Sequence, residues 1–375
     1  MGTTRFKPVA MAAAVALALS VAACGAANEE PAQSGSSNPN AAATEAAVEL
    51  SGNVAGAGAS SQEAAMQAWT VGFQETNPDA TIQYDPVGSG GGREQFIAGG
   101  TQYGGTDSHF KEEELTKAQE RCGGPDNLIE IPVYISPIAI IYNLEGVENL
   151  QLSPETLAKI FKQEIKTWDD AAIKADNPDA TLPSDRITVV NRSDESGTTE
   201  NFQQYLAAVA PDVWTFEPGQ EWPVKGGEAA QGTSGVVDAV KAGKGAIGYA
   251  DASQAGELGK ANIKVGEEFV APTPEAAAKI LETSEETEDP GTHVFTYTLA
   301  RDTTEAGTYP IVLVSYLMAC TQYDDAAQGA LVKAFVGYVI SAEGQQAAAT
   351  NAGSAPISDA VRAKVQPAVD AIAAN

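Results

Sequence analysis

The chain of 375 residues is long enough to form two lobes, and its 50 Asp and Glu against 22 Lys and Arg give a net charge of -28. So acidic a surface repels nucleic acid and anionic lipid, and neither is expected as a partner. With only two histidines and no HExxH or Cys-x-x-Cys spacing, the sequence offers no cluster of metal ligands.

The beginning of the chain has the pattern of an export signal. Arg5 and Lys7 precede an uncharged, Ala-rich apolar segment over 9–23 that is too short and too weakly apolar to span a membrane. This segment ends in VAACG, which resembles the bacterial lipobox, where the cysteine is lipidated and becomes the mature N-terminus. We expect a signal peptide over 1–23 and a lipid anchor on Cys24, at the outer face of the cell membrane.

The residues after Cys24 indicate a flexible tether. Residues 24–47 are rich in Ala, Ser, Asn, Pro and Glu, and no large apolar residue occurs before Val48. Such a composition cannot bury a core and holds a folded body away from the membrane.

The body opens with a first junction between a strand and a helix. A short strand is expected at 48–50, followed by the small and hydroxylated segment GNVAGAGASS, which ends in Ser60 and Ser61. A helix begins directly afterwards, because apolar residues recur every fourth position from Ala65 to Phe73, and the Asn-Pro that follows stops it.

A second junction of the same kind follows. Residues 81–84 alternate as a strand and lead into VGSGGG, which contains Ser89 and precedes a helical pattern over 93–98. The glycines do not have the spacing of a dinucleotide site or a phosphate loop, and taken alone they favour a tight turn. Arg93 is either a second cation near a pocket or a surface residue, and its position at a helix start favours the surface.

Two features of the middle of the chain bear on the fold and the site. Asp107 ends the segment 102–107 and either caps the charged helix expected over 111–121 or accepts a hydrogen bond in a site. Residues 128–142 are the most apolar of the body and amount to two buried strands interrupted by Pro132 and Pro137. A crossing between lobes is expected there, because proline limits ladder pairing.

A third junction contains the string RSDESGTT, which runs from Arg192 to Thr199. It follows the expected strand 187–190 and precedes a helix beginning near Glu200. Backbone N–H groups, hydroxyls and the positive end of a helix dipole meet here, which suits an anion, and Arg192 adds a planar cation. Taken alone, the string favours a simpler interpretation, in which Ser196 caps the helix beside a surface pair of Arg192 and Asp194.

The remaining elements complete an α/β pattern. Helices are expected from Ser153, from about 166 to 177 and from about 232, a buried strand at 244–249, an acidic helical stretch over 272–289, a strand over 311–317, and two closing helices over 326–340 and 342–350. An exported protein most simply pairs its remaining cysteines, Cys122 and Cys320, although two separate buried thiols are the alternative.

The three junctions together form a chemically meaningful set. In open α/β sheets such loops gather at the carboxyl ends of the strands, where ligands bind. With Arg192 and Asp107 they supply anion donors, one cation and one acceptor. Phosphate near neutral pH carries a proton that a carboxylate can accept, whereas sulfate carries none and would be repelled.

The sequence resembles the phosphate-binding lipoproteins that serve ABC phosphate importers. The strings GAGASS, VGSGGG, YGGTD, KTWDD, NRSDESGTT and GKGAIGY occur in the family's order over about 48–375. The resemblance implies a type II periplasmic-binding-protein fold with two α/β lobes, mixed sheets and a ligand cleft between them. Lobe I would comprise 48–134 and 309–375, and lobe II 135–308.

The resemblance also implies the ligand contacts. Asp107 would accept the phosphate proton and Asp194 would pair with Arg192. The implied phosphate-binding residues are Ser60, Ser61, Ser89, Asp107, Arg192, Ser196, Gly197 and Thr198. Many family members have Thr-Phe where this chain has Ser60-Ser61, which keeps the hydroxyl but leaves the packing there open.

The expected function is extracytoplasmic binding of phosphate by a monomer, without a cofactor, and delivery to the permease subunits of an importer. Arsenate also carries a proton and is an alternative ligand, and sulfate is a less suitable one. An exported phosphatase with Ser89 or Ser196 as nucleophile is disfavoured, because His109 and His293 serve no G-x-S-x-G elbow or metal cluster. A surface adhesin or sensor that only keeps the fold is a further alternative.

Overall fold

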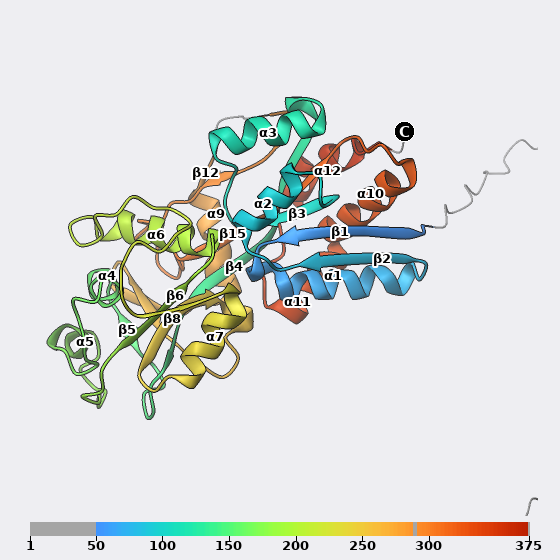
Figure 1. Cartoon of the computed structure of the whole chain (residues 1–375). Helices are drawn as coiled ribbons and strands as arrows, with labels where there is room; N and C mark the ends of the chain where they lie inside the picture. Colours follow the sequence, from blue (N-terminus) through green and yellow to red (C-terminus); the bar gives the residue numbers. More distant parts are fainter. Residues whose placement is uncertain (1–49, 288–290, 374–375) are drawn as a thin grey trace, which may run out of the picture. The chain divides into compact units, whose positions relative to one another are not determined.

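The computed structural model describes residues 50–287 and 291–373 (Figure 1). The expected signal peptide over 1–23, the tether over 24–47 and the lipidated Cys24 lie outside these residues. Among the residues described, no helix is both long enough and apolar enough to span a membrane.

One mixed sheet runs through the fold and carries the loops of interest at its strand ends. The strand order is β2-β1-β3-β15-β4-β8-β6-β7, and β9 and β13 also pair with β4. β1 runs parallel to β2 and β3, β15 runs antiparallel to β3 and β4, and β8 runs antiparallel to β4 but parallel to β6. The bounds are β1 (Gly52–Gly58), β2 (Ala80–Asp85), β3 (Tyr103–Thr106), β4 (Leu128–Asn143), β6 (Thr188–Arg192), β7 (Glu228–Ala230), β8 (Ala246–Asp251), β9 (Gly259–Lys260), β13 (His293–Val294) and β15 (Val312–Cys320).

β4 is a single strand of 16 residues where two strands were expected. Its first part, as far as Pro137, pairs with β15, and the part from Ile138 pairs with β8. Pro132 lies opposite Tyr316, where the register between the two strands shifts. The irregularity accommodates a residue that cannot donate to the ladder, and the strand continues through both prolines.

Helices cover the sheet. α1 (Glu63–Thr76) buries Ala65, Trp69 and Phe73 on the predicted face, ends at the predicted Asn77 and packs against α11 (Ala342–Ala352). α2 packs on β1 and β3, and α7 on β6 and β8. The other helices of at least five residues are α2 (Ser89–Ile97), α3 (Glu112–Cys122), α4 (Pro154–Phe161), α5 (Ala171–Asp176), α6 (Gly197–Val209), α7 (Gly232–Ala242), α8 (Pro274–Ala278), α10 (Ala326–Ile340) and α12 (Asp359–Asp370).

Two expectations near the start of the body were wrong. The segment GNVAGAG forms strand β1 itself, because its small residues let neighbouring side chains lie on the strand: a Cβ on Gly56 would come within 2.3 Å of the Tyr103 ring. α2 begins at Ser89 and not at Arg93, so the glycine run forms the first helical turn.

The second half of the chain also departs from the sequence prediction. Helix α5 begins at Ala171, because Asp170 caps it by accepting the N–H of Ala172. Within the acidic stretch 272–289, the described residues form only α8, α9 (Ile280–Thr283) and β12 (Glu285–Glu286), which pairs with β14 (Tyr297–Thr298). A third closing helix, α12, was not predicted.

The smaller elements include a second sheet of β5 (Gln151–Leu152), β10 (Asn262–Val265) and β11 (Glu268–Val270). Cys122, at the end of α3, and Cys320, at the end of β15, form a disulfide with their Cα atoms 5.3 Å apart. The bond ties α3 to the sheet next to the strand that leads to Asp107.

Candidate functional site

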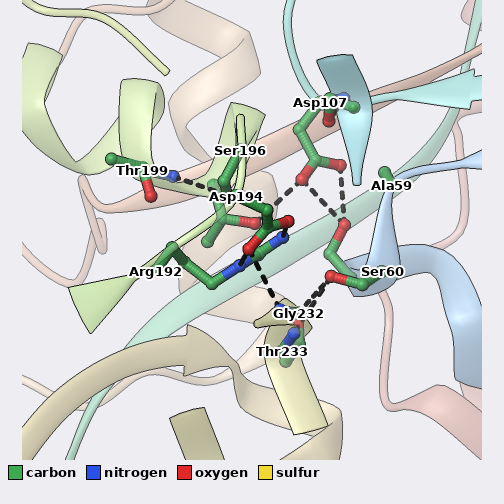
Figure 2. A network of polar contacts seen from close by, with 12 residues as sticks. Ala59, Ser60, Asp107, Arg192, Asp194, Ser196, Thr199, Gly232 and Thr233 are labelled. Atoms are coloured by element: carbon green, nitrogen blue, oxygen red, sulfur yellow. Dashed lines mark hydrogen bonds and ion pairs between the residues drawn. The ribbon is translucent and has the colours of Figure 1, made fainter. Parts of the chain in front are cut away.

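Asp107 directly follows β3, and hydroxyl groups surround its carboxylate. Ser61 Oγ donates to Oδ1 and Oδ2 at 2.7 and 2.8 Å. Thr198 Oγ1 donates to Oδ2 at 2.9 Å, and Ser315 Oγ donates to Oδ1 at 2.5 Å. The carboxylate therefore points toward the loop that carries Ser60 (Figure 2) and is held by three neutral donors from three different elements.

The surroundings of Asp107 set its charge. The residue is 3% exposed, and burial raises the pKa of its carboxyl, while the hydroxyl hydrogen bonds and the charge of Arg192 oppose that rise. Asp107 does not cap α3, whose N-cap is Lys111, so the capping interpretation was wrong. A buried carboxylate with neutral donors can accept a proton-bearing group.

The first two loops contact residues far away in the sequence. Ser60 Oγ accepts the N–H of Thr233, the second residue of α7, at 3.0 Å, and Gln254 Nε2 donates to the Ser60 carbonyl at 2.7 Å. Ser89, the first residue of α2, accepts the N–H of Asp107 with its Oγ at 3.1 Å. The carboxyl ends of β1, β2 and β3 thus converge around Asp107.

Arg192 ends β6 and forms a forked ion pair with Asp194. Its Nε donates to Asp194 Oδ1 at 2.8 Å and its Nη2 binds Oδ2, while the N–H of Gly232 also donates to Oδ1 at 3.0 Å (Figure 2). Burial by itself would raise the pKa of Asp194, but the contacts with Arg192 and Gly232 bring it below its usual value. Arg192 is only 3% exposed, so the pair is not on the surface.

Helix α6 begins at the third junction, beside Asp107. Ser196 Oγ accepts the N–H of Thr199 at 3.1 Å and so caps the helix, as the simpler interpretation of the string held. A Cβ on Gly197 would lie 2.7 Å from Asp107 Cβ and 2.8 Å from Ser89 Oγ. Only glycine fits here, because the junctions approach one another so closely.

Gly88, in the loop after β2, is crowded in the same way by the loop after β6. Its φ of +97° lies in the region that glycine adopts without strain, and a Cβ would lie 2.6 Å from Asp194 Oδ2. The N–H of Gly90 donates to the carbonyl of Glu195 at 3.2 Å, which joins the second loop directly to the third.

The structure brings the residues that were predicted to contact phosphate together, and each of them is buried, while Asp194 beside them is partly buried. Sequence reasoning missed several residues that hold them. Gly232 and Thr233 open α7, a helix that the sequence predicted from about 232. Ser315, Asn201 and Gln254 carried no signal: Ser315 is a lone polar residue in an apolar strand, and nothing local distinguishes Asn201 or Gln254 from other polar residues.

The prediction that Arg93 lies on the surface was wrong. Its side chain is fully buried, with Nε bound to Glu114 at 3.0 Å, Nη1 to Thr106 Oγ1 at 3.0 Å and Nη2 to Gln220 Oε1 at 2.7 Å. Because α2 starts at Ser89, Arg93 lies in its second turn and faces α3 rather than solvent. Its hydrogen bond to Thr106 supports the last residue of β3.

His109, two residues after Asp107, pairs with a buried carboxylate. His109 Nδ1 lies 2.7 Å from Glu130 Oε2, and Glu130 is fully buried. Over 50–287 and 291–373, no group of three or more His, Cys, Asp or Glu could hold a metal ion. The arrangement offers donors, one acceptor and one balanced cation.

Comparison with known proteins places the chain in a family. Residues 33–343 match the model of the PBP superfamily domain. Phosphate-binding protein PstS 3 of Mycobacterium tuberculosis strain H37Rv is 38% identical over 313 residues, which cover 82% of this chain and 84% of that protein. PstS 2 of the same strain is 33% identical over 314 residues, with 82% and 84% covered.

Solved structures share the fold. The high-affinity periplasmic phosphate-binding protein PfluDING, bound with phosphate, matches with a TM-score of 0.70 and 24% identity, covering 84% of this chain and 93% of that one. A putative phosphate ABC transporter substrate-binding protein with bound phosphate from Clostridium perfringens matches with a TM-score of 0.57 and 19% identity, covering 80% and 98%. The chain belongs to the PBP superfamily and, within it, to the PstS phosphate-binding proteins.

Proposed function

We propose that this protein binds inorganic phosphate outside the cytoplasm and delivers it to an ABC phosphate importer. The observation that carries the proposal is the buried Asp107 carboxylate, which faces three hydroxyl groups and lies beside the N-terminus of α6. Such a site gives an anion neutral donors and gives its proton an acceptor.

The proposed roles follow from position. Asp107 accepts the proton of phosphate, and the ion pair with Asp194 orients Arg192 and moderates its charge. The donors are the hydroxyl and backbone N–H groups of Ser60, Ser61, Ser89, Ser196, Gly197 and Thr198. Arsenate, which also carries a proton, would fit the same roles, whereas sulfate would place an unprotonated oxygen against Asp107.

The proposal includes two lobes that close on the ligand. Lobe I comprises 48–134 with 309–375, and lobe II comprises 135–308. The change of partner along β4, from β15 to β8 after Pro137, supports a crossing near that boundary. The closed form would be the one that the permease subunits recognise, presented by a monomer anchored through Cys24 to the outer face of the membrane.

Titration calorimetry of the mature chain with phosphate and with sulfate, in the same buffer, tests the proposal. We expect phosphate to bind and sulfate to bind hardly at all. Equal affinity for both anions would overturn the phosphate assignment. Incubation with a chromogenic phosphate ester is the second arm, and sustained turnover would overturn the assignment as a binding protein without enzymatic activity.

A further inference from the structure

Arg301 is a buried cation outside the set of proposed ligand residues. It follows β14, is 5% exposed and has three hydrogen-bond acceptors: the Val312 carbonyl at 3.4 Å, Gln204 Oε1 at 3.1 Å and Asn201 Oδ1. All three are neutral oxygens. Burial lowers the pKa of its guanidinium to about 10, so the group stays charged at neutral pH.

Asn201 connects Arg301 to the site. Its Nδ2 donates to the Asp107 carbonyl at 2.7 Å and to the Gly197 carbonyl at 2.9 Å. A single amide therefore holds the loop after β3 against the first turn of α6. These are the two segments that present the proposed proton acceptor and the proposed donors of the helix start.

The orientation of this amide depends on Arg301. An asparagine amide can turn over and exchange its oxygen with its nitrogen, and only one orientation presents Nδ2 to both carbonyls. The guanidinium has only donors, so it stabilises the orientation in which Oδ1 faces it. Without that donor, the oxygen would be buried without a partner, and turning the amide over would direct it at two carbonyl oxygens.

We propose that Arg301 is a positioning residue for phosphate binding, which acts by fixing the Asn201 amide that joins Asp107 to Gly197. The inference rests on the proposed function. The hydrogen bonds of Arg301 reach Val312, Gln204 and Asn201, so its hydrogen-bonded link to both segments passes through Asn201. A buried charge with neutral acceptors costs free energy, and this role gives a reason for it.

A double-mutant cycle on the mature chain tests the inference, with phosphate affinity measured by calorimetry. We expect Arg301→Met to weaken phosphate binding about tenfold in the natural background and less than twofold in an Asn201→Ala background. Arg301→Lys keeps a donor and should recover part of the loss. Gln204→Ala is the matched control, because Gln204 also contacts Arg301 but lies outside the link to Asp107, and it should change affinity less than twofold.

Each outcome decides between two possibilities. An equal loss in both backgrounds would show that Arg301 acts independently of Asn201, through general support of the fold or through its charge, and it would overturn the inference while leaving the proposed function intact. Absence of phosphate binding by the unmodified chain would overturn the proposed function and this inference with it. Urea unfolding without phosphate identifies variants that do not fold; if Arg301→Met is one, the cycle is run with Arg301→Lys, and additivity there also overturns the inference.

Discussion

Asp107 and Asp194 are two carboxylates of one cluster with opposite surroundings. Asp107 is buried and faces the hydroxyls of Ser61, Thr198 and Ser315, and its pKa is raised. Asp194 is partly buried and faces the Arg192 guanidinium and the N–H of Gly232, and its pKa is lowered. The cation is thus paired with Asp194, whereas the groups hydrogen-bonded to the Asp107 carboxylate are neutral hydroxyls.

The difference explains how so acidic a chain could select an anion. Because Asp194 moderates Arg192, the general attraction for anions is weak, and binding depends on hydrogen bonds whose donors and acceptor must match the ligand. Asp107 would then provide discrimination and Arg192 only part of the affinity. Substitutions of Asp107 and its hydroxyl partners should therefore change the selectivity between anions. Substitutions of the Arg192–Asp194 pair should mainly change affinity.

The largest effect is expected for Asp107→Asn. The amide cannot accept the phosphate proton in the same way, so phosphate affinity should fall about a thousandfold, or ~4 kcal/mol. Sulfate should bind more tightly than before, since the amide N–H can donate to it. Calorimetry with both anions measures the gap; Asp85→Asn, the same change at an exposed strand end, is the control. A preserved preference for phosphate would contradict the role of Asp107.

Asp251 is a second buried carboxylate with hydroxyl partners, and it allows the effect of burial on a carboxyl pKa to be tested away from the site. It is fully buried and accepts from Tyr134 Oη at 3.1 Å and from the N–H of Ser253 at 2.9 Å, and burial raises its pKa to about 6. Since the folded pKa exceeds the unfolded one, the folded state holds the proton more tightly. Stability should therefore be greatest below pH 4 for this group and be lost as the pH rises to about 6.

The measurement is urea unfolding at several pH values in phosphate-free buffer. Relative to Asp251→Asn, the natural chain should lose up to ~3 kcal/mol of unfolding free energy between pH 4 and 6. A constant difference between the two chains across this range would show that burial does not govern the charge of Asp251.

The sequence predicted the strand-to-helix junctions of the candidate site better than it predicted the residues that support them. Ser61, Ser89 and the string from Arg192 lie at strand-to-helix junctions, and local patterns reveal such junctions. Ser315 and Asn201 contact Asp107 from more than ninety residues away, and nothing local distinguishes them.

The errors of fold have a similar cause. β1 was not recognised as a strand, because glycine has a low strand propensity and Gly56 is required there by the Tyr103 ring that packs against it. Arg93 was placed on the surface, because its partners Glu114 and Gln220 come from other elements. In each case tertiary packing overrode a preference that was correct locally.

Arg192→Lys should have a smaller and different effect. Lysine keeps the charge but loses the fork, so one ammonium group must serve both Asp194 and the ligand. Phosphate affinity should fall about tenfold, and the ratio of phosphate to sulfate affinity should stay within about twofold of its natural value. Arg186→Lys, on an exposed side chain before β6, is the control. A changed ratio would mean that Arg192 also contributes to the discrimination between phosphate and sulfate. The proposed division of roles between Asp107 and Arg192 would then be wrong.

Ser61→Ala should have the smallest effect at high pH and a growing one as the pH falls. The hydroxyl of Ser61 opposes the effect of burial on Asp107, so its removal raises the pKa of that carboxyl further. A protonated Asp107 no longer accepts from phosphate, so affinity should decline at a higher pH in the variant. At pH 8, the upper end of the series, the loss should be smallest, at about threefold.

Calorimetric titrations from pH 5 to 8 measure this profile. Natural chain and variant are compared at each pH, so the titration of phosphate itself cancels. A constant ratio of affinities over the whole range would mean that Ser61 acts only as a donor to the ligand. A ratio that grows toward low pH would mean that the Ser61 hydroxyl also lowers the pKa of Asp107. Neutral hydroxyls would then favour the charged form of Asp107, as the Arg192 guanidinium does for Asp194.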